Sequence, residues 1–168
     1  MLKGTQENLL GGTSGSEQIG GPEEKQTTAR NFSFKQQNLR RSEVESQANN
    51  TKKIVYDDGT VYIGETAGNA KQGKGKLMSP NGDTIEGDFV DDRIQGKAKF
   101  VGADGTVYDG EWKDDIQHGY GKETWADGSS YTGHQKDGVK HGQGEYHWAD
   151  GSSYSGNWVA GNIEGYVS

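Results

Sequence analysis

Apolar and polar side chains alternate over short stretches between residues 51 and 168. In the segment 108–112, which reads Tyr-Asp-Gly-Glu-Trp, the aromatic residues and the glycine have one parity and the two acids have the other. The segment 142–148 repeats this arrangement, with glycines and aromatic residues in one parity and Gln, Glu and His in the other. Because successive side chains of a β-strand point to opposite faces, this pattern predicts short strands with one aromatic face and one polar face.

The alternating pattern returns with a period of 23 residues. Self-similarity in this range indicates a repeat architecture rather than an ordinary globular domain. The central glycine of the first segment recurs as Gly64, Gly87, Gly110, Gly133 and Gly156. A second glycine, which always follows Asp or Asn, recurs as Gly59, Gly82, Gly105, Gly128 and Gly151.

Asp-Gly and Asn-Gly pairs favour tight turns that need positive φ, and such turns match the twist of antiparallel strands. We therefore expect each 23-residue unit to contain two short strands, with this pair forming the turn to the next unit. The predicted fold is all-β: an elongated, twisted, single-layer antiparallel sheet that grows by one hairpin per unit.

The glycines inside the strands need a separate explanation, because glycine normally weakens a strand. We expect an aromatic ring to lie flat across each glycine, so that a row of rings replaces an aliphatic core. Leu, Ile, Val and Phe make up only 25 of the 168 residues, too few for a conventional core. Aromatic pairs contribute about 0.5–1.5 kcal/mol each beyond the area that they bury.

The repeat is imperfect at a few positions. Ile85 replaces the tyrosine of the motif once, and Ala98 replaces one glycine of a Gly-x-Gly pair. Glu123 has the parity of the aromatic face, which predicts that it pairs with a neighbouring residue or lines a groove. At the position of the motif tryptophan, the five units carry Thr66, Phe89, Trp112, Gln135 and Trp158.

One unit contains the three motifs Tyr108-x-Gly110-x-Trp112, His118-Gly119-x-Gly121 and Asp127-Gly128. Over about residues 54–168, this spacing resembles the MORN (membrane occupation and recognition nexus) repeat family. The resemblance implies an open sheet with an aromatic groove and a role in binding or assembly. Such modules occur in cytoskeletal and ciliary scaffolds, including radial-spoke head proteins, and in junctophilins. In family members that are enzymes the catalysis belongs to another domain, so the resemblance implies a non-catalytic scaffold.

Residues 1–50 differ in character from residues 51–168. They contain Phe32 and Phe34 as their only aromatic residues and carry six acids and six bases. Residues 1–30 are rich in Gly, Ser, Thr, Gln and Glu, which is typical of a flexible tail. We therefore expect an N-terminal arm over residues 1–50 and a repeat domain of about five units over residues 51–168.

Residues 30–44 of this arm include a candidate docking segment. Its residues are two aromatics followed by a basic pair, namely Phe32, Phe34, Arg40 and Arg41. This segment is predicted to bind the acidic rim of the sheet or an assembly partner. A linker with two isolated phenylalanines is the simpler alternative.

Charge and composition exclude several classes of function. Residues 51–168 carry 19 acids and 12 bases, a poor surface for nucleic acid or anionic lipid, which both select for clustered Lys and Arg. The chain contains no cysteine, which excludes disulfides, thiolate metal sites and cysteine nucleophiles. It has neither the apolar segment of a signal peptide at its start nor an apolar run of membrane-spanning length, so we expect a cytoplasmic protein. The resemblance to MORN proteins implies a place in the cytoskeleton, cilium or axoneme.

The sequence gives little support for an enzyme, a metal site or a cofactor. His118 and His141 occupy the same repeat position, so their recurrence is explained by structure. A zinc site shared by histidines of two chains is disfavoured because a sheet spreads equivalent side chains apart. The acid pairs Asp91-Asp92 and Asp114-Asp115 are expected in solvated loops. The Gly-x-Gly pairs lack the residues of a phosphate-binding loop.

Partner binding is the main functional prediction, because a single-layer sheet leaves one aromatic face uncovered and such exposed apolar patches mark interaction sites. The expected partner is a helix or an extended protein segment, and the acidic loops predict that it is basic. The open sheet ends also allow self-association. The alternative is a membrane tether that binds anionic lipid through Lys74, Lys76, Lys97 and Lys99. The residues predicted to form the partner-binding groove are Tyr108, Trp112, Trp125, Tyr131, Tyr146, Trp148, Tyr154 and Trp158.

Overall fold

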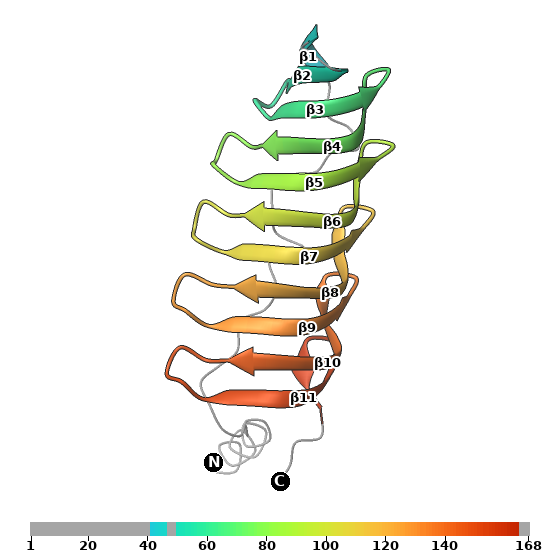
Figure 1. Cartoon of the computed structure of the whole chain (residues 1–168). Helices are drawn as coiled ribbons and strands as arrows, with labels where there is room; N and C mark the ends of the chain where they lie inside the picture. Colours follow the sequence, from blue (N-terminus) through green and yellow to red (C-terminus); the bar gives the residue numbers. More distant parts are fainter. Residues whose placement is uncertain (1–40, 47–49, 165–168) are drawn as a thin grey trace, which may run out of the picture.

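The computed structural model describes residues 41–46 and 50–164. In these residues twelve antiparallel strands form one open sheet, and their order in space is their order in sequence, β1 to β12. The hairpins are stacked in a ladder with a turn at either side of every unit (Figure 1). The predicted all-β, single-layer antiparallel sheet is confirmed.

The strands are six to nine residues long, apart from the short last one. Their bounds are β1 Arg41–Ser46, β2 Thr51–Tyr56, β3 Val61–Ala67, β4 Ala70–Met78, β5 Thr84–Val90, β6 Arg93–Val101, β7 Val107–Lys113, β8 Ile116–Thr124, β9 Ser130–Lys136, β10 Val139–His147, β11 Ser153–Val159 and β12 Asn162–Ile163.

Units are joined at one side of the sheet by the predicted Asp-Gly and Asn-Gly turns. Between β6 and β7, Gly105 has a φ of 93°, and its amide donates a hydrogen bond of 3.0 Å to the carbonyl of Gly102. The Asp104 carboxylate accepts a bond of 2.9 Å from the amide of Thr106, which lowers the pKa of Asp104. The prediction that this glycine provides a positive φ at the turn is confirmed.

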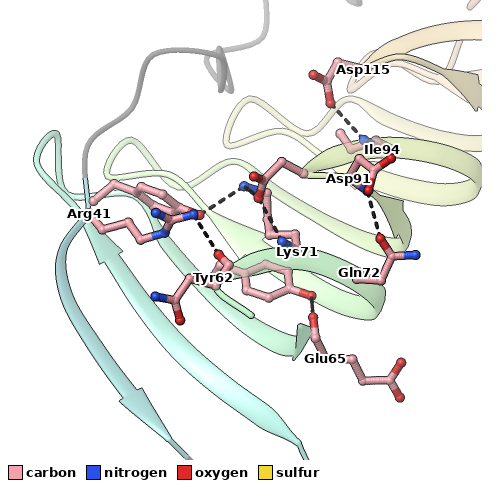
Figure 2. Close-up of polar contacts among 11 residues, drawn as sticks. Arg41, Tyr62, Glu65, Lys71, Gln72, Asp91, Ile94 and Asp115 are labelled. Carbon is pink, nitrogen blue, oxygen red and sulfur yellow. Dashed lines mark hydrogen bonds and ion pairs between the residues drawn. The ribbon is translucent and has the colours of Figure 1, made fainter. Parts of the chain in front are cut away.

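At the other side of the sheet, two-residue turns close each hairpin. Asp114 and Asp115 follow β7 with φ values of 50° and 73°, and the amide of Asp115 donates to the carbonyl of Ile94 in the preceding unit at 3.1 Å. The Asp115 carboxylate accepts from the Ile94 amide at 2.9 Å (Figure 2). These paired bonds attach this turn to the unit before it.

The expectation that the acid pairs lie in solvated loops was wrong for Asp115. Its side chain is buried, and the burial raises the pKa of its carboxyl group. The preceding turn is less buried: the Asp92 carboxylate accepts from the backbone amide of Lys71 at 2.8 Å. The neighbouring amide of Asp91 donates to Gln72 Oε1 at 2.9 Å (Figure 2). The solvated position was predicted wrongly because the sequence does not show that the turn packs against the preceding unit.

Tyrosine rings lie over the strand glycines, as predicted, but each ring comes from the same strand as the first glycine that it covers. A Cβ atom added to Gly121 would lie 2.3 Å from Tyr108 Oη, and one added to Gly110 would lie 2.7 Å from it. The Tyr108 hydroxyl then donates a bond of 3.0 Å to the carbonyl of Glu111. The glycines therefore make room for a ring whose polar end is held by the backbone.

Two departures from the repeat are explained by this packing. Ala98 occupies the position of Gly121 in the second unit, and the residue that would cover it is Ile85 rather than tyrosine. Isoleucine has no hydroxyl-bearing ring to extend over the next strand, so the methyl group of alanine fits there. Glycine and tyrosine are thus required together at these two positions.

The sheet also extends into the segment that the sequence placed in the N-terminal arm. Strand β1 pairs with β2, from Arg41 opposite Tyr56 to Ser46 opposite Lys52. The Arg41 guanidinium donates to the carbonyl of Asn69, in the turn between β3 and β4, at 2.8 Å (Figure 2). Arg41 thereby fixes the start of the described chain against the first units.

Candidate functional site

The eight predicted groove residues lie on one face of the sheet, which we call the inner face. In register across the strands, Tyr108 lies opposite Glu123, Glu123 opposite Tyr131, and Tyr131 opposite Tyr146. Ring contacts connect the tryptophans to this row, with centroid separations of 5.4 Å for Tyr108–Trp112 and 5.4 Å for Tyr131–Trp158. Trp125 and Trp148 flank Tyr146, at 5.7 Å and 4.8 Å.

The rings are tied to the backbone as well as to each other. The Trp112 indole donates to the carbonyl of Ala98 at 3.0 Å, and the Trp158 indole donates to that of Gly144 at 3.2 Å. The Tyr131 hydroxyl donates to the carbonyl of His134 at 2.6 Å. Burial raises the pKa values of the Tyr62, Tyr108 and Tyr131 hydroxyls.

The expectation that these rings are exposed was wrong. Seven of the eight predicted groove residues are buried, with exposed fractions of at most 9%, and Tyr154 is half-buried. Parity along a strand had placed them on the correct face, but it does not report how deeply each ring packs. Exposure of an apolar surface therefore cannot be the feature that marks a binding site on this face.

Three polar side chains interrupt the inner face. We call Gln117, Glu123 and Gln135 the polar step; their exposed fractions are 1%, 0% and 2%. Gln117 lies opposite Trp112, and Gln135 lies opposite Lys140.

The polar step separates the two apolar clusters of the sheet. The N-terminal cluster runs from Ile54 to Trp112, and the C-terminal cluster consists of Trp125, Tyr131, Tyr146, Trp148 and Trp158.

The two glutamines of the polar step have no hydrogen-bond partner for either atom of their side-chain amides. The buried indole nitrogen of Trp148 also lacks a partner. A buried polar group left without a partner destabilises a fold by about 1–3 kcal/mol, and each such group in a native structure needs an explanation. An external hydrogen-bonding ligand provides one.

Sequence reasoning identified part of this step. Glu123 was predicted to line a groove or to pair with a neighbour, and Gln135 was noted as a departure at an aromatic position. Gln117 was missed. Comparison of its repeat position in the other units would have found it, because those units carry Lys71, Ile94, Lys140 and Ile163.

Two buried lysines share the inner face with the rings, and the sequence analysis did not identify them. The Lys140 ammonium lies 5.4–5.8 Å from the centroids of four rings and is 0% exposed. The Lys71 ammonium lies 3.0 Å from the Tyr56 hydroxyl and 3.3 Å from the Asp92 carboxylate (Figure 2). Aromatic faces stabilise such cations, so these lysines help to hold the rings in place.

The histidine at the repeated His-Gly position has a structural contact. His118 Nδ1 accepts from the amide of Asp137, in the next turn, at 3.4 Å. Gln95 makes the equivalent bond to the amide of Asp114 at 3.0 Å, which supports the structural interpretation of this position. Within the described ranges no three His, Cys, Asp or Glu side chains are grouped as metal ligands would be.

The four lysines proposed to bind lipid lie on the outer face, where acids oppose them. Lys74 pairs with Asp88 at 2.6 Å, and this hydrogen bond raises the pKa of Lys74. In register, Lys97 lies opposite Glu111, and Lys99 lies between Glu86 and Asp109. On the outer face, these lysines therefore lie opposite acids of the neighbouring strands. Among the residues that the structure describes, no helix has the length and apolar character needed to cross a membrane.

Of the candidate docking arm, only Arg41 belongs to the described residues. Phe32, Phe34 and Arg40 lie outside them. The position of Arg41 at the start of β1 nevertheless establishes where the arm joins the sheet.

Comparisons with known proteins agree with the repeat pattern. No curated protein matches the chain significantly. One solved structure that it resembles is the SAS-4 (dCPAP) TCP domain in complex with a proline-rich motif of Ana2 (dSTIL) of Drosophila melanogaster, with 15% identity, a TM-score of 0.45, and coverage of 82% of this chain and 70% of that chain. The model of the MORN repeat matches residues 62–84, 86–107, 108–130, 131–153 and 154–166. Because these five matches cover more than half of the chain, it belongs to the MORN repeat family.

Proposed function

We propose that this chain is a non-catalytic scaffold or adaptor that binds a segment of a partner protein along its inner face. MORN repeats are in general a non-catalytic, protein-interaction scaffold, and this chain has the open sheet of such a scaffold. The observation that carries the proposal is the pair Gln117 and Gln135, whose amides are buried among aromatic rings and have no hydrogen-bond partner.

The chemistry of these amides indicates the kind of partner. A glutamine amide presents one carbonyl acceptor and two N–H donors, which match the N–H and C=O groups of an extended backbone. A helix satisfies most of its own backbone groups and would leave these amides without partners. The partner is therefore an extended segment whose backbone lies at the polar step.

The charge of the repeat region adds a preference for basic residues in the partner. Residues 51–168 as a whole are acidic, which speeds the approach of a basic segment.

The family resemblance supports the placement of this scaffold in a cytoskeletal or axonemal assembly, as a subunit comparable to radial-spoke head proteins. Within the described part of the chain, the sheet ends at β1 and β12, and these end strands offer edges to another copy or a neighbouring subunit. Localisation of the tagged full-length chain in its own cells tests this placement, and a distribution unrelated to cytoskeletal structures would contradict it.

Membrane binding is the less favoured function, because the lysines needed for it are opposed by acids on the outer face. Sedimentation of the protein with vesicles that contain anionic lipid tests this alternative. Binding that is lost as salt is added would support a basic patch, whereas equal recovery with neutral and anionic vesicles would exclude one.

The decisive experiment compares Gln117→Leu/Gln135→Leu with the full-length wild type in affinity purification from the native cell. Leucine removes the hydrogen-bonding atoms without creating a cavity, so the variant folds and loses only the polar contacts. Loss of two hydrogen bonds of about 0.5–1.5 kcal/mol each predicts roughly 5- to 150-fold weaker binding of the specific partner.

The matched control is Gln143→Leu, an exposed glutamine whose amide contacts Asn157 on the outer face. The proposal requires that this control recover the partner as the wild type does. Equal recovery by the inner-face double variant would contradict it, as would a partner whose cross-links map to the outer face.

A further inference from the structure

We propose that the outer face of the N-terminal half of the sheet binds an amphipathic helix of a partner protein that carries basic residues along one side. The inference goes beyond the proposed function, because it assigns the opposite face of the sheet to a different kind of segment. The binding surface is a row of six side chains, one from each of the strands β2 to β7, which we call the outer stripe. Its residues are Val55, Val61, Met78, Thr84, Val101 and Val107.

The outer stripe is continuous along the sheet and is open to solvent. Each of its residues lies opposite the next in register, from the pair Val55 and Val61 to the pair Val101 and Val107. Val101 is 37% exposed, and the other five residues are half-buried. Ile63, which is 38% exposed, lies on the same face two residues after Val61. The stripe is therefore an uncharged and mainly apolar surface.

The repeat shows that the sheet does not require apolar residues in this row. The equivalent residues in the next strands, β8 to β11, are Thr124, Ser130, His147 and Ser153. They lie opposite one another in the same register as the outer stripe. Because the same backbone forms with polar side chains there, the apolar residues of β2 to β7 need another explanation. Exposed apolar surfaces of this kind mark interaction sites.

The spacing of the outer stripe favours a helix over an extended segment. Neighbouring residues of the stripe are one strand apart, which is about 4.8 Å. A helix with apolar residues alternately three and four positions apart presents one of them every 5.3 Å or so along its axis, on the order of the strand spacing. An extended segment presents successive side chains of one face about 6.6 Å apart, so it loses register within a few strands. The five strand intervals of the stripe measure about 24 Å, a length that about 16 helical residues span.

Acidic turns border the outer stripe and give the partner its charge. The stripe lies beside the turns that join the units, on the left in Figure 1. Asp58 and Asp104 are exposed in the turns at its two ends, and their carboxylates accept hydrogen bonds of 2.8 Å and 2.9 Å from the amides two residues later. These bonds hold the two negative charges at the edge of the stripe, and Asp57 adds a third. The two turns are four strands or about 19 Å apart, close to the rise of about 21 Å over 14 helical residues.

The opposite border of the outer stripe carries no net preference for either sign. Its charged residues lie in register in pairs of opposite sign, namely Lys53 with Glu45, Lys76 with Glu86, and Lys99 with Asp109. The acidic turns therefore decide the preference of this surface. A helix with a base every seventh residue on the side of the turns complements them.

The test measures the binding of a synthetic peptide to the full-length chain by fluorescence anisotropy. The basic probe has about 18 residues, with leucines at alternating intervals of three and four, lysine every seventh residue on one side of the leucines, and alanine or glutamine elsewhere. A second probe has glutamate in place of each lysine. The basic probe should bind, and added salt should weaken its binding. The glutamate probe should bind about tenfold more weakly.

The protein variant Val101→Ser/Val107→Ser removes methyl groups from two neighbouring residues of the outer stripe. It should bind the basic probe about fivefold more weakly. Serine is already present at the repeat position of Val107, as Ser130, so the variant keeps the sheet, and a urea titration checks its folding. The matched control is Val90→Ser/Ile116→Ser, which changes residues that are 43% and 39% exposed at the other edge of the same face. This control should bind the basic probe as the wild type does.

Equal binding by the stripe variant, equal binding of the two probes, or no binding of the basic probe at about 1 mM would each overturn the inference. Self-association of the chain that the stripe variant abolishes would assign the stripe to a second copy instead. Recovery with neutral or anionic lipid vesicles that the same variant abolishes would assign it to a membrane, and either result rejects the helix.

The two binding surfaces can be tested independently. Gln117→Leu/Gln135→Leu on the inner face should bind the basic probe as the wild type does. If the probe fails to bind while recovery of the native partner depends on these glutamines, the helix inference fails and the proposed function stands. Binding of the probe that depends on the outer stripe, with partner recovery unaffected by the glutamines, would show the reverse.

Discussion

The packing of Tyr108 over Gly121 predicts that these two residues are energetically coupled. A Cβ atom in Gly121→Ala would lie 2.3 Å from the tyrosine Oη, a distance that no relaxed contact allows. The ring must therefore move and lose its bond to the carbonyl of Glu111. Strain from overpacking of about 1–3 kcal/mol and a buried hydroxyl left without its partner at about 1–3 kcal/mol together predict a loss of about 2–6 kcal/mol.

The second unit shows how the cost of this substitution can be removed. There, Ala98 is accommodated because Ile85 takes the place of the tyrosine. Tyr108→Ile alone should lower the free energy of unfolding by about 2–4 kcal/mol through the lost ring volume. In the Tyr108→Ile background, however, Gly121→Ala should cost less than about 1 kcal/mol, because the clashing hydroxyl is absent and alanine restricts the unfolded chain.

The assay is a double-mutant cycle by urea unfolding, with tryptophan fluorescence as the signal. The interaction energy is the difference between the costs of Gly121→Ala in the two backgrounds and should be at least about 1 kcal/mol. Gly110→Ala is the matched control: Tyr108→Ile removes its contact with Tyr108 Oη at 2.7 Å but leaves its Cβ 2.4 Å from the backbone Cα of Gly121, so the rescue should be only partial. Strictly additive effects of Gly121→Ala and Tyr108→Ile would refute the packing argument, as would equal rescue of the control.

Three further predictions concern stability. In a urea titration, Gln117→Leu should raise the free energy of unfolding by about 1–3 kcal/mol, because it removes a buried amide without partners. The control Gln143→Leu on the outer face should change the free energy of unfolding by less than about 0.5 kcal/mol. Destabilisation by Gln117→Leu would show that its amide is hydrogen-bonded in solution. Tyr62, Tyr108 and Tyr131 have raised pKa values in the fold, so the unfolded chain loses these protons first and stability should fall as the pH rises above about 10. The part of the tyrosinate absorbance that comes from these three residues should appear only at the unfolding transition. The bond from the Thr106 amide lowers the pKa of Asp104, so the contribution of Asp104 to stability is present above the unfolded pKa near 4 and is lost as the pH falls. Asp104→Asn, which keeps the turn as Asn81 does, should reduce this loss of stability in thermal melts between about pH 2 and 5. An unchanged dependence of the melting temperature on pH would contradict the assignment.

The sequence was sufficient to predict the sheet because both of its determinants are local. Alternation gives the face of each side chain, and Asp-Gly pairs such as Asp104-Gly105 give the turns. Even the two departures at Ile85 and Ala98 carried information, since they occur together where the ring and the glycine would otherwise meet. The strand faces, the turns and the paired substitutions all depend only on residues that are adjacent in the chain or on neighbouring strands.

The properties that were missed depend on three-dimensional curvature and on contacts between units. The burial of Asp115 follows from a turn with two positive φ values, which brings its carboxylate onto the amide of Ile94. The low exposure of the rings and the cation site of Lys140 depend on what lies around and above the inner face, which parity along a strand does not report. Gln117 was overlooked because each glutamine is unremarkable alone and becomes informative only against its repeat-equivalent residues.

The polar step has a mechanical consequence for a scaffold of this kind. In a stack where each unit contacts only its neighbours, stability is approximately the sum of unit and interface terms. The N-terminal and C-terminal apolar clusters meet at Gln117, Glu123 and Gln135, so the junction between them lacks the continuous ring contacts found within each cluster. A bound segment that spans this junction satisfies the amides and also adds apolar contacts to both clusters. Partner binding should therefore stabilise the weakest interface of the sheet most strongly, which makes the stiffness of the scaffold depend on its occupancy.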